Sequence, residues 1–269
     1  MSKYEFEVDK ICNYLKPLTE QLHDLYQWNA KIDRLEELSV FTKKQIDEIS
    51  NLSPYDKELK IKKAVNAKLN EAYQLTDKQN FYDLCSWIIK DWGGILTGND
   101  QNTIKLIDEF LATDKPTYNR IASSSKIGSF MRPTDYIIYD SRVAYSLNWI
   151  LLSETSSNIF FPIPEGRNSK MMAFDMNVLI RLKNIGHYKS QTADERDNRL
   201  YINKKDKQFY IPEKEAYTEL NGLIRQINDN LWIDDQEKKD NLFYTEMLLF
   251  SIADKQIFDD ITNRVEIKI

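Results

Sequence analysis

Asp140 is the residue of this chain whose position best suits chemistry. It follows the aliphatic and aromatic run Tyr136–Tyr139 and precedes a helical pattern that begins at Ser141. A carboxylate at a helix start accepts backbone N–H hydrogen bonds from the first turn, and the helix dipole stabilises its ionised form. A carboxylate held in this way could also stabilise a developing positive charge or deprotonate a water molecule. The sequence leaves both roles open: a cap alone, or a cap that takes part in catalysis.

Basic and hydroxyl side chains lie close to Asp140 in the sequence. A Ser-rich segment opens a short predicted helix upstream, and arginines occur on both sides of Asp140. Helix-start N–H groups, hydroxyls and Lys or Arg side chains together suit phosphate oxygens. We therefore expect a phosphate-binding set made of Arg120, Ser124, Ser125, Lys126, Arg132 and Arg142. The alternative is a solvated helix end with ordinary caps.

Aromatic side chains could form a pocket beside this carboxylate. The candidates for the pocket wall are Tyr139, Trp87, Trp92 and Trp149. Each also has apolar neighbours at helical spacing, which is typical of a core residue. Both roles are therefore kept for each of them.

Two further carboxylates have aromatic or apolar neighbours. Asp91 lies between two tryptophans near a Gly-Gly turn, and Glu246 lies within an apolar helical pattern. Asp91 is either a second carboxylate beside the pocket or an exposed residue near a helix end. Glu246 is either a buried acid paired with an arginine such as Arg225 or a residue on the helix edge.

The composition indicates a mainly helical protein. The chain has 269 residues, 42% hydrophobic and 29% charged, with only 7 Gly and 7 Pro. Few helix breakers and many Lys, Glu, Leu and Ile favour helices. The formal net charge of −5 argues against a broadly basic nucleic-acid-binding surface but allows a local one. Without a recognisable secretory signal or membrane span, we expect a cytoplasmic protein.

Several metal and cofactor classes are not indicated. The chain has two histidines, His23 and His187, and two cysteines, Cys12 and Cys85, that lie far apart in the sequence. They form no cluster with metal-ligand spacing, which argues against a structural zinc site, and two cysteines are too few for an iron–sulfur cluster. No P-loop, dinucleotide-binding, zinc-protease or nucleophile-elbow motif occurs. We therefore expect no metal site and no cofactor.

Helices are the elements expected to position these residues. Ser53-Pro54 predicts a helix start, and Gly93-Gly94 predicts a left-handed helix end. Pro133 should end the preceding helix near Met131. Two β-prone runs around a charged turn predict a small β-hairpin over residues 199–212.

The sequence shows no clear domain boundary. We expect an N-terminal helical region over residues 1–90 and a second helical region over residues 91–269, or one single domain. The second region would carry the candidate residues.

The order of elements around Asp140 resembles the helix-hairpin-helix superfamily of base-excision DNA glycosylases. In that family a helical hairpin precedes a proline, a hydrophobic run and a segment that reads approximately Val-Asp-Thr-His-Val, with a later Leu on the same helix. Here Tyr139 to Val143 match the segment, Leu147 matches the later Leu, and the hairpin would span about residues 119–130. The resemblance implies a helical fold with such a hairpin and makes Asp140 the essential carboxylate.

The resemblance also implies a chemistry in which a carboxylate is needed. Breaking an N-glycosidic bond builds positive charge on the sugar, and the base must leave the DNA stack to be reached. The family's hairpin carries a Gly-x-Gly turn, whereas this segment has the single Gly128. The lysine nucleophile of bifunctional members lies farther from the Asp than Lys126 does, which favours a monofunctional reaction with water.

The leading hypothesis is a monofunctional DNA N-glycosylase that acts on a damaged or modified base. DNA would be its partner, in repair or in defence against foreign DNA. The alternative is a non-catalytic helical module that binds nucleic acid or a partner protein through the same segment. It predicts salt-sensitive nucleic-acid binding that survives loss of the Asp140 charge.

Overall fold

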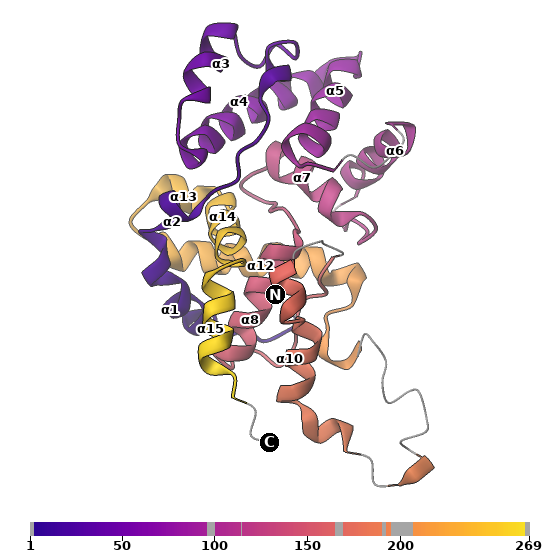
Figure 1. The fold of residues 1–269 in the computed structure, drawn as a ribbon. Helices are drawn as coiled ribbons and strands as arrows, with labels where there is room; N and C mark the ends of the chain where they lie inside the picture. Colours follow the sequence, from indigo (N-terminus) through magenta and orange to yellow (C-terminus); the bar gives the residue numbers. More distant parts are fainter. Residues whose placement is uncertain are drawn as a thin grey trace.

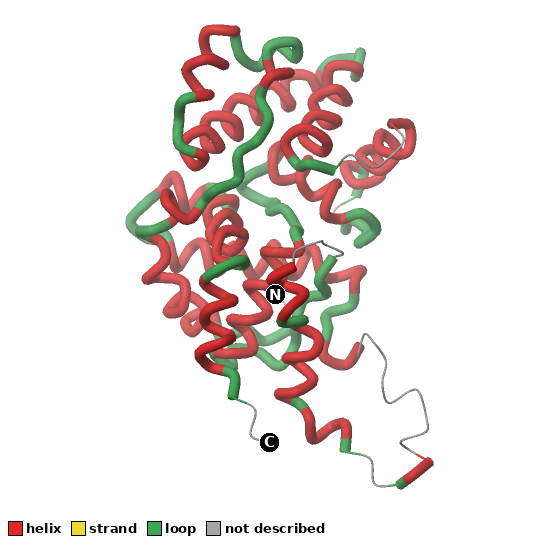
Figure 2. The backbone as a smooth tube through the Cα atoms, viewed as in Figure 1, coloured by secondary structure: helices red, strands yellow, loops and turns green. Residues whose placement is uncertain are grey.

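The computed structural model is a helical body with helices joined by loops and turns (Figures 1 and 2). It describes residues 3–95, 100–113, 115–164, 169–189, 192–194 and 207–266. No strand occurs within these ranges, so the mainly helical class predicted from composition is confirmed.

The described helices follow one another along the whole chain. The α-helices are α1 (Val8–Thr19), α2 (Leu22–Leu25), α3 (Lys43–Ser50), α4 (Pro54–Gln74), α5 (Gln79–Trp87), α6 (Asp100–Leu111), α7 (Ile121–Met131), α8 (Ser141–Ser153), α9 (Ser169–Ala173), α10 (Met176–Lys183), α12 (Glu213–Leu231), α13 (Gln236–Asp240), α14 (Phe243–Ile252) and α15 (Gln256–Arg264). Shorter elements are the 3-10 helices η1 (Asp33–Leu35), η3 (Ile185–Tyr188) and η5 (Lys207–Phe209) and the π-helical turn η2 (Ile88–Trp92).

Three predicted helix boundaries, one start and two ends, are confirmed. The Ser53 hydroxyl accepts the Asp56 N–H at 3.1 Å and Pro54 is the first residue of α4. The π-helical turn η2 follows α5 directly, and Gly94 then has a φ of +66°. α7 ends at Met131, as the proline two residues later requires. Local capping and breaking residues thus define these boundaries.

The buried apolar side chains of the described residues form two clusters. One cluster joins α3, α4, α5 and η2, the upper helices in Figure 1, and the other joins the lower helices α1, α8, α12 and α14. α1 packs against α12 and α2 packs against α14, so both N-terminal helices belong with the C-terminal half of the chain. Each cluster therefore combines segments that lie far apart in the sequence.

Helix α7 joins the two clusters. Ile121 belongs to the lower cluster, whereas Ile127 and Phe130 belong to the upper one. α7 is one uninterrupted helix, so the hairpin expected over about residues 119–130 is not present there. Gly128 is not a turn residue: a Cβ atom on it would lie 2.9 Å from Phe110 Cζ. The glycine permits close packing between α6 and α7.

The segment between α7 and α8 begins with a turn at residues 133–135 and is held by side chains. The Ile137 N–H donates to Asn221 Oδ1, the Ile138 N–H to Glu246 Oε2 and the Tyr139 N–H to Ser125 Oγ, each at 2.9 Å. Buried backbone N–H groups need such partners, and here side chains of α12, α14 and α7 supply them. This fixes the backbone that leads directly into Asp140.

The predicted β-hairpin over residues 199–212 is not found in the described part of the chain. Its first run lies outside the described residues, and Lys207–Phe209 of the second run form η5. Tyr210 instead makes an isolated parallel bridge with Phe160. The β-prone residues of the second run therefore pair with a distant loop.

None of the described helices combines enough length with enough apolar character to cross a bilayer.

Candidate active site

Asp140 is the N-cap of α8. Its Oδ1 accepts the Arg142 N–H at 2.9 Å, and its φ and ψ of −96° and 154° are those of an extended cap residue. Every residue from Val143 to Leu152 is buried, so α8 is anchored along most of its length. The cap prediction is confirmed, and the half-buried carboxylate has a rigid mount.

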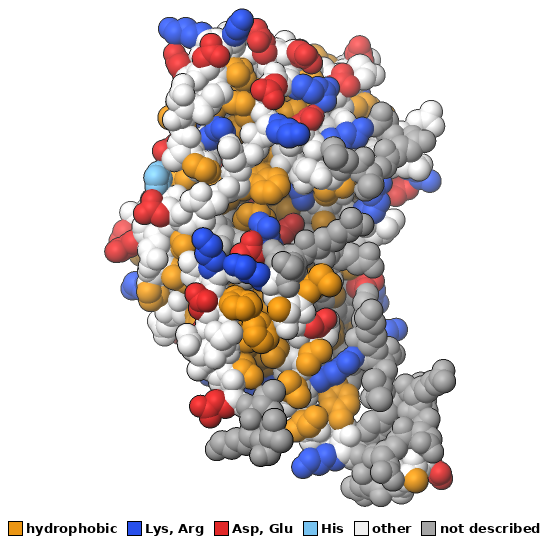
Figure 3. Space-filling view, in the orientation of Figure 1, with side chains coloured by type: hydrophobic (Ala, Val, Ile, Leu, Met, Phe, Trp, Pro, Cys, Tyr) orange, Lys and Arg blue, Asp and Glu red, His pale blue; other side chains and the backbone are white. Residues whose placement is uncertain are grey.

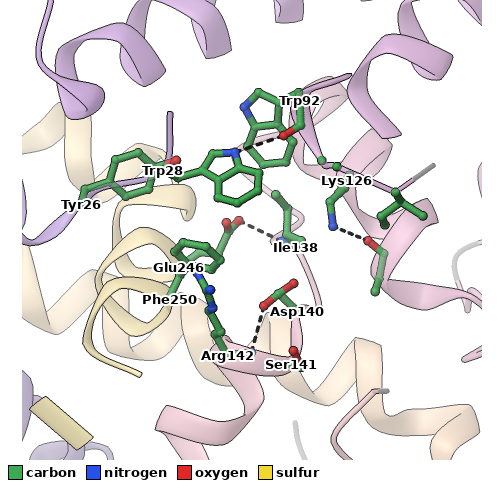
Figure 4. A pocket seen from close by; sticks show the side chains of 14 residues that line it. Tyr26, Trp28, Trp92, Lys126, Ile138, Asp140, Ser141, Arg142, Glu246 and Phe250 are labelled. Atoms are coloured by element: carbon green, nitrogen blue, oxygen red, sulfur yellow. Dashed lines mark hydrogen bonds between the residues drawn. The ribbon is translucent and has the colours of Figure 1, made fainter. Parts of the chain in front are cut away.

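A cavity of about 380 Å³ lies between the upper and lower helices, and Asp140 forms part of its lining (Figure 4). Its size falls in the range of small-molecule sites, about 300–1,000 Å³. The lining residues come from the segment after α2, from η2 and the glycines that follow it, from α7, from the start of α8 and from α14. They are Tyr26, Trp28, Trp92, Gly93, Gly94, Ile95, Ala122, Lys126, Ile138, Asp140, Ser141, Arg142, Glu246 and Phe250. On the face shown in Figure 3, hydrophobic, basic and acidic side chains meet between the two groups of helices.

Three aromatic rings form one wall of this cavity. Trp28 meets Trp92 and Phe250 edge to face, with centroids 6.4 and 6.1 Å apart. The Trp28 indole N–H donates to the Trp92 carbonyl oxygen at 3.1 Å. This hydrogen bond joins the upper and lower halves of the wall and holds its rings in place.

Lys126 approaches the cavity from α7 against a glycine backbone. A Cβ atom on Gly93 would lie 2.7 Å from Lys126 Cε, so only glycine leaves room for this side chain. Lys126 is 5% exposed and its Nζ donates to the Ala122 carbonyl oxygen at 2.7 Å. Burial lowers the pKa of Lys126 below the ordinary lysine value, and the Asp140 and Glu246 carboxylates act in the opposite direction.

Gly93→Ala is expected to lower the free energy of unfolding by about 1–3 kcal/mol, the usual cost of overpacking. The new methyl group would lie 2.7 Å from Lys126 Cε and 2.8 and 2.9 Å from the Ile89 and Ile88 carbonyl oxygens, whereas the φ of −85° itself strains no side chain. Gly222→Ala in α12 is the matched control, because a Cβ there meets nothing within 4 Å, and we expect it to stabilise by up to about 1 kcal/mol. Chemical denaturation measures both; equal effects of the two substitutions would contradict the close contact at Gly93.

Glu246 lies on α14 and is 5% exposed. Its Oε2 accepts the Ile138 N–H at 2.9 Å and the Ser129 hydroxyl at 3.4 Å. Burial raises the pKa of Glu246, and the Lys62 ammonium is the strongest opposing influence. Of the two alternatives for this residue, buried acid is the correct one. Its cationic neighbours are Lys62 and Lys126. Arg225 pairs instead with Asp135 at 3.1 Å.

A buried charged group lies behind the aromatic wall. Glu58 and Lys62 of α4 are 1% and 4% exposed, and their nearest charged atoms are 3.9 Å apart. The Trp92 indole N–H donates to Glu58 Oε2 at 2.9 Å. Burial raises the pKa of Glu58 as well. The wall tryptophan is therefore anchored by a carboxyl group that does not itself line the cavity.

Of the expected phosphate-binding set, the structure brings Lys126 and Arg142 to the cavity. The Arg142 guanidinium lies 4.7 Å from the Phe250 ring centroid and 3.4 Å from Asp254 Oδ2. Ser124 and Ser125 are 2% and 0% exposed, so neither can meet a phosphate.

The buried serines fail as phosphate ligands for a packing reason. The Ser125 hydroxyl donates to the Ile121 carbonyl oxygen at 2.5 Å and accepts the Tyr139 N–H, which holds α7 against the segment before α8. Arg120 precedes α7 with a left-handed φ of 51°, and Arg132 lies at the opposite end of α7 over the Tyr136 ring. Neither arginine belongs to the cavity lining.

Only Trp92 of the four expected pocket aromatics lines the cavity. Trp87 is 0% exposed within the upper core. Tyr139 donates its hydroxyl to the Pro162 carbonyl oxygen, and Trp149 donates its indole N–H to Asp260 Oδ2. These three residues are buried in the core and do not line the cavity.

Asp91 is likewise separate from the cavity lining. Its Oδ2 receives an Arg34 N–H at 2.9 Å, and its side chain is 26% exposed. It is therefore a partly exposed, paired carboxylate.

Sequence patterns missed most of the aromatic wall. Trp28 follows α2 in a segment without helical periodicity, and Phe250 lies in the apolar helix α14. A large aromatic residue outside a periodic segment is the one local signal that could have indicated Trp28. Phe250 carries no such signal, since its neighbours are equally apolar.

Comparisons of this chain with protein-family models, with curated proteins and with solved structures found no match.

Proposed function

We propose that this chain is a monofunctional DNA N-glycosylase in which Asp140 stabilises the sugar cation. The observation that carries the proposal is that Asp140, which caps its own helix through Oδ1, also lines an aromatic-walled cavity of about 380 Å³. Its resemblance to the helix-hairpin-helix glycosylases at Tyr139 to Val143 gives the same residue the essential role.

The chemistry assigned to Asp140 follows from its position. As the N–glycosidic bond of an extruded nucleotide lengthens, positive charge develops at C1′, and a fixed carboxylate nearby lowers the energy of that state. Asp140 can then accept a proton from the water that adds to C1′. Its Oδ1 is occupied by the Arg142 N–H, so the carboxylate does not need to reorganise during the reaction.

The aromatic wall supports the binding of an extruded base. Stacking on aromatic rings contributes about 1–3 kcal/mol per base and suits any base, because each has a π-face. Trp28, Trp92 and Phe250 supply this surface beside Asp140. The unpairing of a base costs a few kcal/mol, which such stacking offsets.

The element proposed to meet the DNA backbone is the α6–α7 pair. The two helices pack against each other, and α7 leads through residues 132–139 into Asp140, the N-cap of α8. In this proposal the turn before α7, with Arg120 in a left-handed conformation, replaces the glycine turn of that family.

We expect no covalent complex between the protein and abasic DNA on borohydride reduction. Lys126 is 5% exposed and its Nζ is bound to the Ala122 carbonyl oxygen, which leaves water as the nucleophile. Gel analysis of the reduced mixture is the measurement. A trapped complex that disappears in Lys126→Arg would instead assign a Schiff-base mechanism to Lys126.

The proposed function is tested with duplexes that each carry one modified or mismatched base. After incubation with the wild-type protein, free base is measured by mass spectrometry and abasic sites by alkaline cleavage. We expect release of at least one base together with equal numbers of intact abasic sites. If the protein binds these duplexes and no base is released from any of them, the chain is a non-catalytic binding module.

A further inference from the structure

Two carboxyl groups line the cavity in contrasting surroundings. Asp140 is half-buried at the N-terminus of α8, where its Oδ1 accepts the Arg142 N–H. Glu246 lies in α14, where every residue from Phe243 to Leu249 is buried. Apolar burial favours the neutral acid. Enzymes divide acid and base roles between two carboxyl groups through such differences in environment.

The Glu246 carboxyl group is oriented by one of its oxygens. Oε2 accepts the Ile138 N–H at 2.9 Å and the Ser129 hydroxyl at 3.4 Å, as Figure 4 shows for Ile138. Among the residues that the structure describes, none forms a hydrogen bond with Oε1. This oxygen is also not fully buried. A proton on Glu246 therefore resides on Oε1, on a side chain that lines the cavity.

The titratable groups around Glu246 come from four elements of the fold: α4, α7, the C-terminal end of α2, and α12. Lys62 and Glu58 belong to α4, Lys126 to α7, and the Tyr26 and Tyr217 hydroxyl groups also interact with its charge. Burial raises the pKa of Glu246 most strongly and Glu58 adds to this, whereas Lys62, the Ile138 N–H and Lys126 lower it. The net direction is upward, so the neutral acid persists to higher pH than in an ordinary glutamic acid.

We propose that Glu246 is the general acid that protonates the departing base, an inference that rests on the proposed glycosylase function. The Oε1 proton moves to a ring nitrogen of the base as the N-glycosidic bond breaks, and the bonding electron pair stays with the base. Water adds to C1′ and transfers its proton to Asp140, from which it passes to solvent. Glu246 regains a proton from solvent before the next reaction.

This role specifies the class of base. A neutral base is a poor leaving group and needs a proton, whereas an N7-alkylated purine is already cationic and leaves without one. General acid catalysis typically contributes about 10²–10⁴-fold to a rate. The cavity is therefore built for neutral modified bases.

The test compares two purine duplexes, one with neutral hypoxanthine and one with cationic 7-methylguanine. Glu246→Gln keeps an oxygen for the Ile138 N–H, and we expect it to slow hypoxanthine release by about 10²–10⁴-fold but 7-methylguanine release by less than about 10-fold. Glu154→Gln is the control, since this carboxyl group pairs with Arg264, lies outside the cavity lining and is not among the groups that act on Glu246, so it should affect both substrates alike.

A pH profile of the wild type makes the test independent of how the variants fold. Release of the neutral base requires protonated Glu246, so its rate should fall as the pH rises through the Glu246 pKa, and this decline should be absent for 7-methylguanine. Equal loss of both substrates in Glu246→Gln, release of 7-methylguanine alone, or identical wild-type profiles would overturn the general-acid role while glycosylase activity remains. No release of either base, or of any other base in the duplex panel, would overturn the proposed function and this inference together.

Discussion

Asp140→Asn is expected to slow base release by about 10²–10³-fold, the typical effect of removing one electrostatic contact with the transition state. The reason is that Asn has the shape of Asp but no charge with which to stabilise the sugar cation. Asn is also as good an N-cap as Asp, so its side-chain oxygen can still accept the Arg142 N–H. Single-turnover kinetics and thermal unfolding of the same sample should therefore show a large loss of rate with little loss of stability.

Asp175→Asn is the matched control for this substitution. Asp175 caps α10 as Asp140 caps α8, with its Oδ1 accepting the Asn177 N–H at 2.8 Å, and it does not line the cavity. We expect Asp175→Asn to leave the rate unchanged within about a factor of two, because the remaining cap is equivalent. Similar rates for wild type, Asp140→Asn and Asp175→Asn would remove Asp140 from the chemistry.

Trp87→Ala is expected to lower the free energy of unfolding by about 3–5 kcal/mol, the usual cost of a large aromatic deletion in a core. Trp87 is 0% exposed and lies in the upper cluster. The sequence also allowed Trp87 to be a base-pocket residue, and this substitution separates the two roles. Urea denaturation measures the effect.

Trp87→Phe should cost much less than Trp87→Ala. The Trp87 indole N–H is buried without a hydrogen-bond partner among the described residues. An unpaired buried donor costs about 1–3 kcal/mol, and Phe removes that penalty while it keeps most of the ring volume. If Trp87→Phe and Trp87→Ala destabilised equally, the core assignment of this side chain would be incorrect.

The features that the sequence predicted correctly depend on neighbours in the chain. Asp140 as a cap, Ser53 as a cap and the end of α7 at Met131 are all governed by side chains within a few residues of the backbone they control. The helical class likewise follows from composition.

The features that the sequence did not predict depend on contacts between distant segments. Trp28 and Phe250 form one wall although more than 200 residues separate them. Ser125 looked suited to phosphate because local rules place serine at helix starts, yet the Tyr139 N–H needs its hydroxyl inside the core. Gly128 resembled a turn residue, but it is required by the approach of the Phe110 ring.

The most direct test of a carboxylate that stabilises a sugar cation does not require the target base to be known. A duplex with a cationic pyrrolidine ring at one abasic position carries the charge of the transition state, and a duplex with a neutral tetrahydrofuran ring has the same shape without the charge. We expect the wild-type protein to bind the pyrrolidine duplex at least about 10²-fold more tightly, and Asp140→Asn to lose this preference. Equal wild-type affinity for the two duplexes would contradict the account.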